Sequence, residues 1–84
     1  MSNKRTSARI LIVDDEANVR SVLMRLLADR YGECVTSHNA FDALNKLKRD
    51  KFSLVLSDVM MPGMTGAELL PFIRKNDPDT AVIM

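Results

Sequence analysis

Four short runs with strand character alternate with three amphipathic segments, and this alternation constrains the fold more than any other feature. The strand-like runs are 9–13, 33–37, 53–57 and 80–84. The segments between them repeat apolar residues at the three- and four-residue spacing of a helix face. Strands that alternate with helices form right-handed βαβ units and a parallel sheet. We therefore predict an α/β fold whose parallel sheet carries helices on both faces, with the half-polar run 33–37 at an edge.

Each predicted helix has its own start or stop signal. The first carries an apolar stripe and ends at Gly32. Asn39 is expected to cap the second helix, and Thr65 with Glu68 forms a capping box for the third. Pro71 lies too deep for a first-turn proline, so we expect a kink or a late start. The stripe residues are Val19, Val22, Leu23, Leu26 and Leu27, then Ala40, Ala43, Leu44 and Leu47, then Leu69, Phe72 and Ile73.

Three aspartates stand where two of the apolar strands end. Asp14 and Asp15 follow the first strand, and Asp58 follows the third. Open parallel sheets bind ligands at this carboxyl edge, and strands 1 and 3 are expected side by side at its centre. Three converging carboxylates repel one another unless a divalent cation lies between them. One of them could then act as a nucleophile toward phosphorus, so the sequence predicts a Mg²⁺-dependent, phosphate-accepting aspartate.

Bulk composition restricts the partners and the compartment. The 84 residues allow one small domain, and a net charge of +1 offers no general argument for binding nucleic acid or a membrane surface. No apolar run approaches membrane-spanning length. Cys34 is the single cysteine, which excludes an internal disulfide and agrees with a cytoplasmic location. We expect residues 1–7 to form a flexible polar arm and residues 8–84 to form the domain.

Two motifs then give a resemblance to a known family. The sequences ILIVDDE at 10–16 and LVLSDVMMPGMTG at 54–66 resemble the receiver domain of bacterial two-component response regulators, over residues 8–84. The resemblance implies a flavodoxin-like (CheY-like) fold with strand order 2-1-3-4-5. It also implies a signalling phosphoacceptor, not an enzyme, that takes its phosphoryl group from a histidine kinase.

The resemblance assigns a role to each residue of the acidic set. Asp58 would be the phosphoacceptor. Asp15 and Asp58 would bind Mg²⁺ directly with the backbone carbonyl of Met60, and Asp14 would reach the metal mainly through water. The Pro-Gly pair at 62–63 would shape the loop beside the site.

The sequence also departs from the family pattern. It stops at Met84 inside an apolar run, which we interpret as a strand cut through. The family continues with a fourth helix, a fifth strand and a fifth helix, and carries a Ser or Thr, a Lys and an aromatic residue beyond this point. We therefore expect a receiver domain incomplete after its fourth strand, a weakened acceptor, and any output domain outside this chain.

Other interpretations remain open. Asp14 and Asp15 could simply cap a helix and supply first-turn charge, although their pairing with the Asp58 motif argues against this. The chain could be a phosphorylation-independent interaction or dimerisation module that self-associates through an exposed strand edge. It could also be a phosphohydrolase of the haloacid dehalogenase type. Those enzymes carry a second aspartate two residues after the nucleophile, where this chain has Met60.

Overall fold

The computed structural model describes residues 9–58 and 63–84. Seven elements follow in the order β1 (Arg9–Val13), α1 (Ala17–Tyr31), β2 (Glu33–Ser37), α2 (Ala40–Arg49), β3 (Leu54–Ser57), α3 (Gly66–Asn76) and β4 (Ala81–Ile83). The predicted arm at 1–7 lies outside the described residues. None of the helices in the described part is long and apolar enough to cross a membrane.

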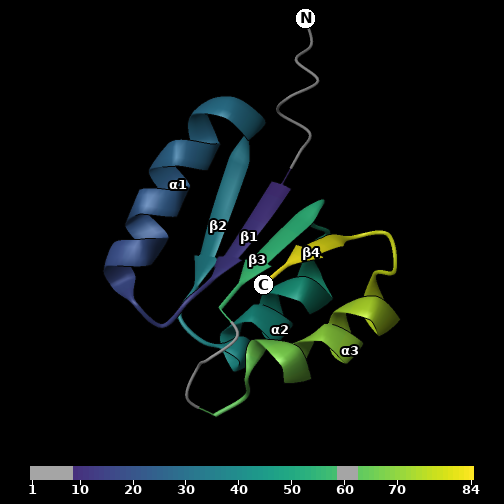
Figure 1. Ribbon diagram of the computed structural model, residues 1–84. Helices are drawn as coiled ribbons and strands as arrows, with labels where there is room; N and C mark the ends of the chain where they lie inside the picture. The colour runs from purple at the N-terminus through teal and green to yellow at the C-terminus, as the bar shows by residue number, and fades with distance from the viewer. Residues whose placement is uncertain (1–8, 59–62) are drawn as a thin grey trace, which may run out of the picture.

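The four strands form one parallel sheet in the order β2-β1-β3-β4. Helix α1 packs on β1 and β2, whereas α2 and α3 pack together on the opposite face (Figure 1). In the register, Leu11 of β1 lies opposite Val35 of β2 and Val55 of β3. This confirms the predicted α/β fold, its parallel sheet with helices on both faces, and the position of β2 at an edge.

The main core lies between the sheet and the α2–α3 layer. Alternate residues of a strand point to opposite faces, so Leu11 and Val13 enter this core, while Ile10 and Ile12 lie beneath α1. All four are buried. The core cluster consists of Leu11, Val13, Ala40, Ala43, Leu47, Phe52, Val55, Leu69 and Ile73.

The helix boundaries follow the predicted local signals. Gly32 has φ 114° and directly follows α1, a backbone conformation that glycine adopts without steric cost. The Asn39 side chain accepts a hydrogen bond from the backbone N–H of Asp42 at 2.7 Å and caps α2. These caps fix the lengths of the connections and hence where each strand returns to the sheet.

Helix α3 contains Pro71 in its interior. Thr65 and Glu68 form the reciprocal capping box, and the helix runs from Gly66 to Asn76 through Pro71. The predicted late start is therefore wrong, because the capping box fixes the first turn ahead of the proline.

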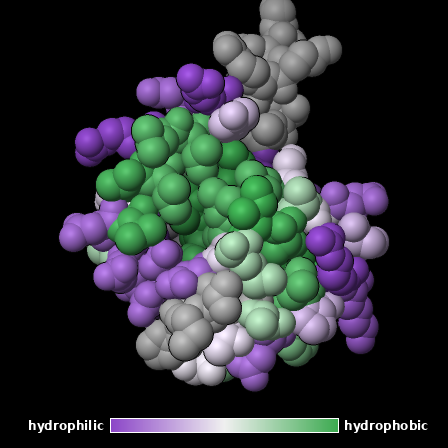
Figure 2. Space-filling view, viewed as in Figure 1, coloured by the Kyte–Doolittle hydropathy of each residue, from purple (hydrophilic) through white to green (hydrophobic). Residues whose placement is uncertain are grey.

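The predicted helix faces are only partly buried. In α3, Leu69 and Ile73 are buried, but Phe72 lies on the flank of that stripe and is 46% exposed. In α1, Val22 and Leu26 are 55% and 62% exposed. Among the described strands, helix α1 packs mainly on β1 and β2, and the flank that carries these two residues faces away from that contact. Figure 2 shows the resulting apolar area, which extends from α1 across the open side of the sheet.

Candidate functional site

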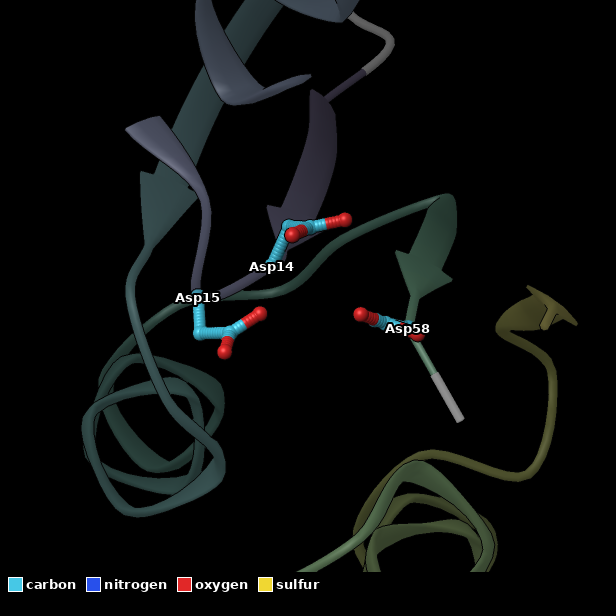
Figure 3. Close-up of side chains that lie close together, drawn as sticks. All are labelled: Asp14, Asp15 and Asp58. Carbon is cyan, nitrogen blue, oxygen red and sulfur yellow. The ribbon is translucent and has the colours of Figure 1, made fainter. Parts of the chain in front are cut away.

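The three aspartates meet at the carboxyl edge of the sheet. Val13 and Ser57 lie opposite each other in the parallel ladder, so the residues that follow them leave the sheet side by side. One carboxylate oxygen from each of Asp14, Asp15 and Asp58 lies within 4.8 Å of the other two. Figure 3 shows the carboxylates of Asp15 and Asp58 extending toward each other, with Asp14 alongside. The structure thus brings together the three residues that the sequence singled out.

Backbone hydrogen bonds hold two of these aspartates at the end of the ladder. The Asp58 N–H donates to the Val13 carbonyl at 2.9 Å, and the Asp14 N–H donates to the Ser37 carbonyl at 3.1 Å. Asp14 and Asp58 are also half-buried, whereas Asp15 is exposed. Strand pairing therefore fixes the backbone of Asp14 and Asp58, from which their side chains extend.

The helix-cap interpretation of Asp14 does not fit the structure. The residue at the N-cap of α1 is Glu16, whose side chain makes no capping hydrogen bond. Asp14 Oδ1 accepts a hydrogen bond from the Glu16 N–H at 2.9 Å, which is a local turn within the β1–α1 connection. An ionised carboxylate has about four acceptor positions, so this bond leaves room for a further partner.

The donor set fits Mg²⁺. This ion takes oxygen ligands at about 2.0–2.1 Å, so two ligands on opposite sides of it lie about 4.2 Å apart. The observed limit of 4.8 Å between the carboxylate oxygens needs only small side-chain rotations to reach that distance. Two like charges about 4 Å apart repel by roughly 1 kcal/mol in bulk water and 4 kcal/mol near a protein surface. A divalent cation between the carboxylates would turn this repulsion into attraction.

A cavity adjoins the acidic cluster. It has a volume of about 220 Å³, and Asp14 and Asp58 line it together with apolar residues from α1, β3 and the end of the chain. This space is open to solvent, so a small molecule from solution could reach the carboxylates of Asp14 and Asp58 through it.

The loop after β3 is described only from Gly63 onward. Met60, which was predicted to offer its carbonyl, and Pro62 lie outside the described residues. Gly63 has φ +84°, and a Cβ atom at this position would lie 3.3 Å from Phe41 Cε2. Both the positive φ and the close approach of Phe41 favour glycine at position 63.

Sequence reasoning missed one residue at the site. The Arg20 Nη1 atom donates a hydrogen bond of 2.7 Å to the backbone carbonyl of Asp14. The sequence did carry a cation near the N-terminus of a predicted helix, which the helix dipole disfavours, but this does not identify the partner.

Comparison with known proteins bears on this site. The family model described as "Response regulator receiver domain" matches residues 10–84. The uncharacterised transcriptional regulatory protein YkoG of Bacillus subtilis is 43% identical over 76 residues, which are 89% of this chain and 33% of that protein. The chain thus spans about a third of the length of this curated relative.

Solved structures share the fold. Response regulator TrrA of Thermotoga maritima, in complex with Mg²⁺ and BeF, superposes with a TM-score of 0.86 at 39% identity, covering 92% of this chain and 67% of that one. TrrA in complex with the histidine kinase ThkA superposes with a TM-score of 0.82 at 39% identity, covering 89% of this chain and 65% of that one.

The acidic cluster predicts that Asp15→Asn changes the stability of the fold in opposite directions without and with Mg²⁺. Without Mg²⁺ the variant should be more stable than the unsubstituted chain, since it removes one of three repelling charges. In the unsubstituted chain, Mg²⁺ at a hundred times its dissociation constant should raise the free energy of unfolding by about 2.7 kcal/mol. The Asp15→Asn variant should lose most of this gain in stability. Urea denaturation with Mg²⁺ and with EDTA measures both effects.

Glu16→Gln is the matched control, because Glu16 is the next acidic residue and lies outside the cluster. It should keep the full Mg²⁺ gain. The same gain in Asp15→Asn and Glu16→Gln would contradict a cation site at these carboxylates.

Proposed function

We propose that this chain, which belongs to the response regulator receiver domain family, accepts a phosphoryl group on Asp58 from a phosphorylated histidine kinase. A receiver domain is a signalling phosphoacceptor rather than an enzyme. The observation that carries the proposal is the convergence of three carboxylate oxygens within 4.8 Å of one another at the ends of β1 and β3. This arrangement gathers negative charge where a cation and a phosphoryl group could be held together.

The three carboxylates would have different tasks. Asp58 directly follows the inner strand β3 and reaches toward Asp15 (Figure 3), which suits a nucleophile placed beside a metal ligand. We assign Asp15 and Asp58 to direct contact with Mg²⁺, and Asp14 to contact through water. The backbone carbonyl of Met60 is proposed as a further ligand on the resemblance alone.

The proposed reaction is an in-line displacement at phosphorus. An oxygen of the Asp58 carboxylate forms a new bond to phosphorus while the bond from phosphorus to the kinase histidine nitrogen breaks. The electron pair of the broken bond stays on the imidazole, which takes up a proton from solvent. When bound, Mg²⁺ supplies positive charge that offsets the charge on the carboxylates and on the transferred group. The fixed positions of Asp14 and Asp58 on the ladder would supply orientation, which is most of what this reaction requires of the protein.

Two relatives support the choice of partner and cation. TrrA has been solved with Mg²⁺ and BeF, and also with the histidine kinase ThkA. We extend both to this chain and propose Mg²⁺ as its cation and a histidine kinase as its partner. We also propose a cytoplasmic location, because Cys34 is a free thiol and thiols stay reduced there.

The assignment to Asp58 predicts the outcome of labelling with a small donor. Incubation of the chain with acetyl phosphate and Mg²⁺ should add one phosphoryl group, detected by intact mass, and Asp58→Asn should abolish the addition. Asp79→Asn is the matched control, because Asp79 is an exposed aspartate outside the acidic cluster. Equal labelling of Asp58→Asn and Asp79→Asn would show that Asp58 is not the acceptor.

A second candidate function rests on the apolar area in Figure 2. Ile83 and Met84 are 57% and 47% exposed, and they line the same cavity as Leu23 and Leu56. Among the described strands, β4 pairs only with β3, so its other edge carries no strand partner. An uncharged edge strand beside an apolar surface favours pairing with an identical strand across a twofold axis. We therefore also propose that this 84-residue chain self-associates through β4, independently of phosphorylation.

Self-association predicts a concentration-dependent sedimentation coefficient at micromolar concentrations. Ile83→Lys should shift the chain toward the monomer, since it places a charge on the paired edge. Phe72→Lys is the matched control, because Phe72 is similarly exposed but lies on α3, on the other face of the sheet. The proposal is wrong if the unsubstituted chain sediments as a monomer throughout, or if the two variants change sedimentation equally.

A further inference from the structure

Arg20 is a charged side chain that contacts the backbone of the acidic cluster but has no task in the proposed reaction. It lies in the first turns of α1, is half-buried, and donates from Nη1 to the Asp14 carbonyl at 2.7 Å. Its own backbone N–H donates to the carbonyl of Glu16 at 3.1 Å, at the start of α1. The side chain therefore joins the start of α1 to the peptide that connects Asp14 with Asp15.

The backbone hydrogen bonds between β1 and its neighbouring strands end just before this peptide. At the end of β1, the Val13 carbonyl accepts from the Asp58 N–H, and the Asp14 N–H donates to the Ser37 carbonyl. Beyond them, the Asp14 carbonyl accepts from Arg20, and the same peptide unit leads directly into exposed Asp15. The orientation of this peptide determines where the Asp15 carboxylate points relative to Asp58.

We propose that Arg20 is a positioning residue for the acidic cluster, which holds the peptide between Asp14 and Asp15 so that the Asp15 carboxylate faces Asp58. The role rests on the proposed function for its purpose, since the geometry it maintains is that of the Mg²⁺ site. Groups that orient the ligands of a metal change its affinity by about 10- to 100-fold when removed. Arg20 acts one peptide away from a carboxylate, so we expect the lower end of that range.

The charge of Arg20 and its hydrogen bond should have opposite effects on the affinity for Mg²⁺, which makes the positioning role testable. A guanidinium near the site repels a cation, so removing its charge alone should tighten Mg²⁺ binding. Loss of the hydrogen bond to the Asp14 carbonyl should loosen the peptide and weaken Mg²⁺ binding. The direction of the change in affinity therefore separates the two effects, without relying on phosphorylation.

The experiment is calorimetric titration of the 84-residue chain with Mg²⁺, with folding checked by far-UV circular dichroism. Arg20→Gln should weaken Mg²⁺ binding about tenfold. Arg20→Lys, which keeps the positive charge and a donor group at the end of the side chain, should have an affinity between that of Arg20→Gln and that of the unsubstituted chain. Arg25→Gln is the matched control, because Arg25 is an exposed arginine further along α1 and this substitution removes the same charge. It should leave the affinity unchanged or slightly higher.

Each outcome decides the matter. Equal or tighter Mg²⁺ binding by Arg20→Gln, relative to Arg25→Gln, overturns the positioning role. If Arg20→Gln does not fold, Arg20→Lys is compared with Arg25→Lys, and weaker binding supports the role while equal binding overturns it. If the unsubstituted chain binds no Mg²⁺, the proposed function and this inference both fall. If it binds Mg²⁺ and the Arg20 variants match their controls, the Arg20 inference alone falls.

Discussion

The parallel pairing of β1 with β3 is the interaction on which the site depends. It places Val13 opposite Ser57, so the next residues of both strands leave the sheet together at its carboxyl edge. A shift of one residue in this register would turn every side chain of a strand to the other face, which would take Leu11 and Val13 out of the core cluster. The apolar core between the sheet and the α2–α3 layer therefore also fixes where the backbone of Asp14 and Asp58 leaves the sheet.

Much of this arrangement could be predicted from the sequence because the signals are local or periodic. The apolar runs, the cap at Asn39 and the capping box of Thr65 with Glu68 each follow from a few neighbouring residues. The convergence of the aspartates followed from one further step, the placement of strands 1 and 3 side by side. The proposals of a Mg²⁺ site and a phosphoacceptor role came from the chemistry of carboxylates and from the family motif.

The remaining features depend on tertiary packing that the sequence does not reveal directly. Val22 and Leu26 have the spacing of buried helix residues but are largely exposed, because exposure depends on which strands lie under α1. Phe72 is exposed for a similar reason, on the flank of α3. Arg20 reaches a backbone carbonyl six residues earlier, and no spacing rule marks such a contact. Sequence patterns thus located the acidic side chains, and only the structure showed what holds them.

The central claim is that a cation binds where β1 and β3 end, and paramagnetic broadening tests it most directly. Mn²⁺ takes the same oxygen ligands as Mg²⁺, and in an amide spectrum of the chain it should first broaden the signals of Asp15, Asp58 and their neighbours. The opposite end of the sheet offers a comparison in the same molecule, since Asp77 and Asp79 lie there before β4. Broadening that begins at the ends of β1 and β3, and that excess Mg²⁺ reverses, is the result we predict. Broadening centred on Asp77 and Asp79, or spread evenly over the acidic surface, would contradict a cation site at Asp14, Asp15 and Asp58.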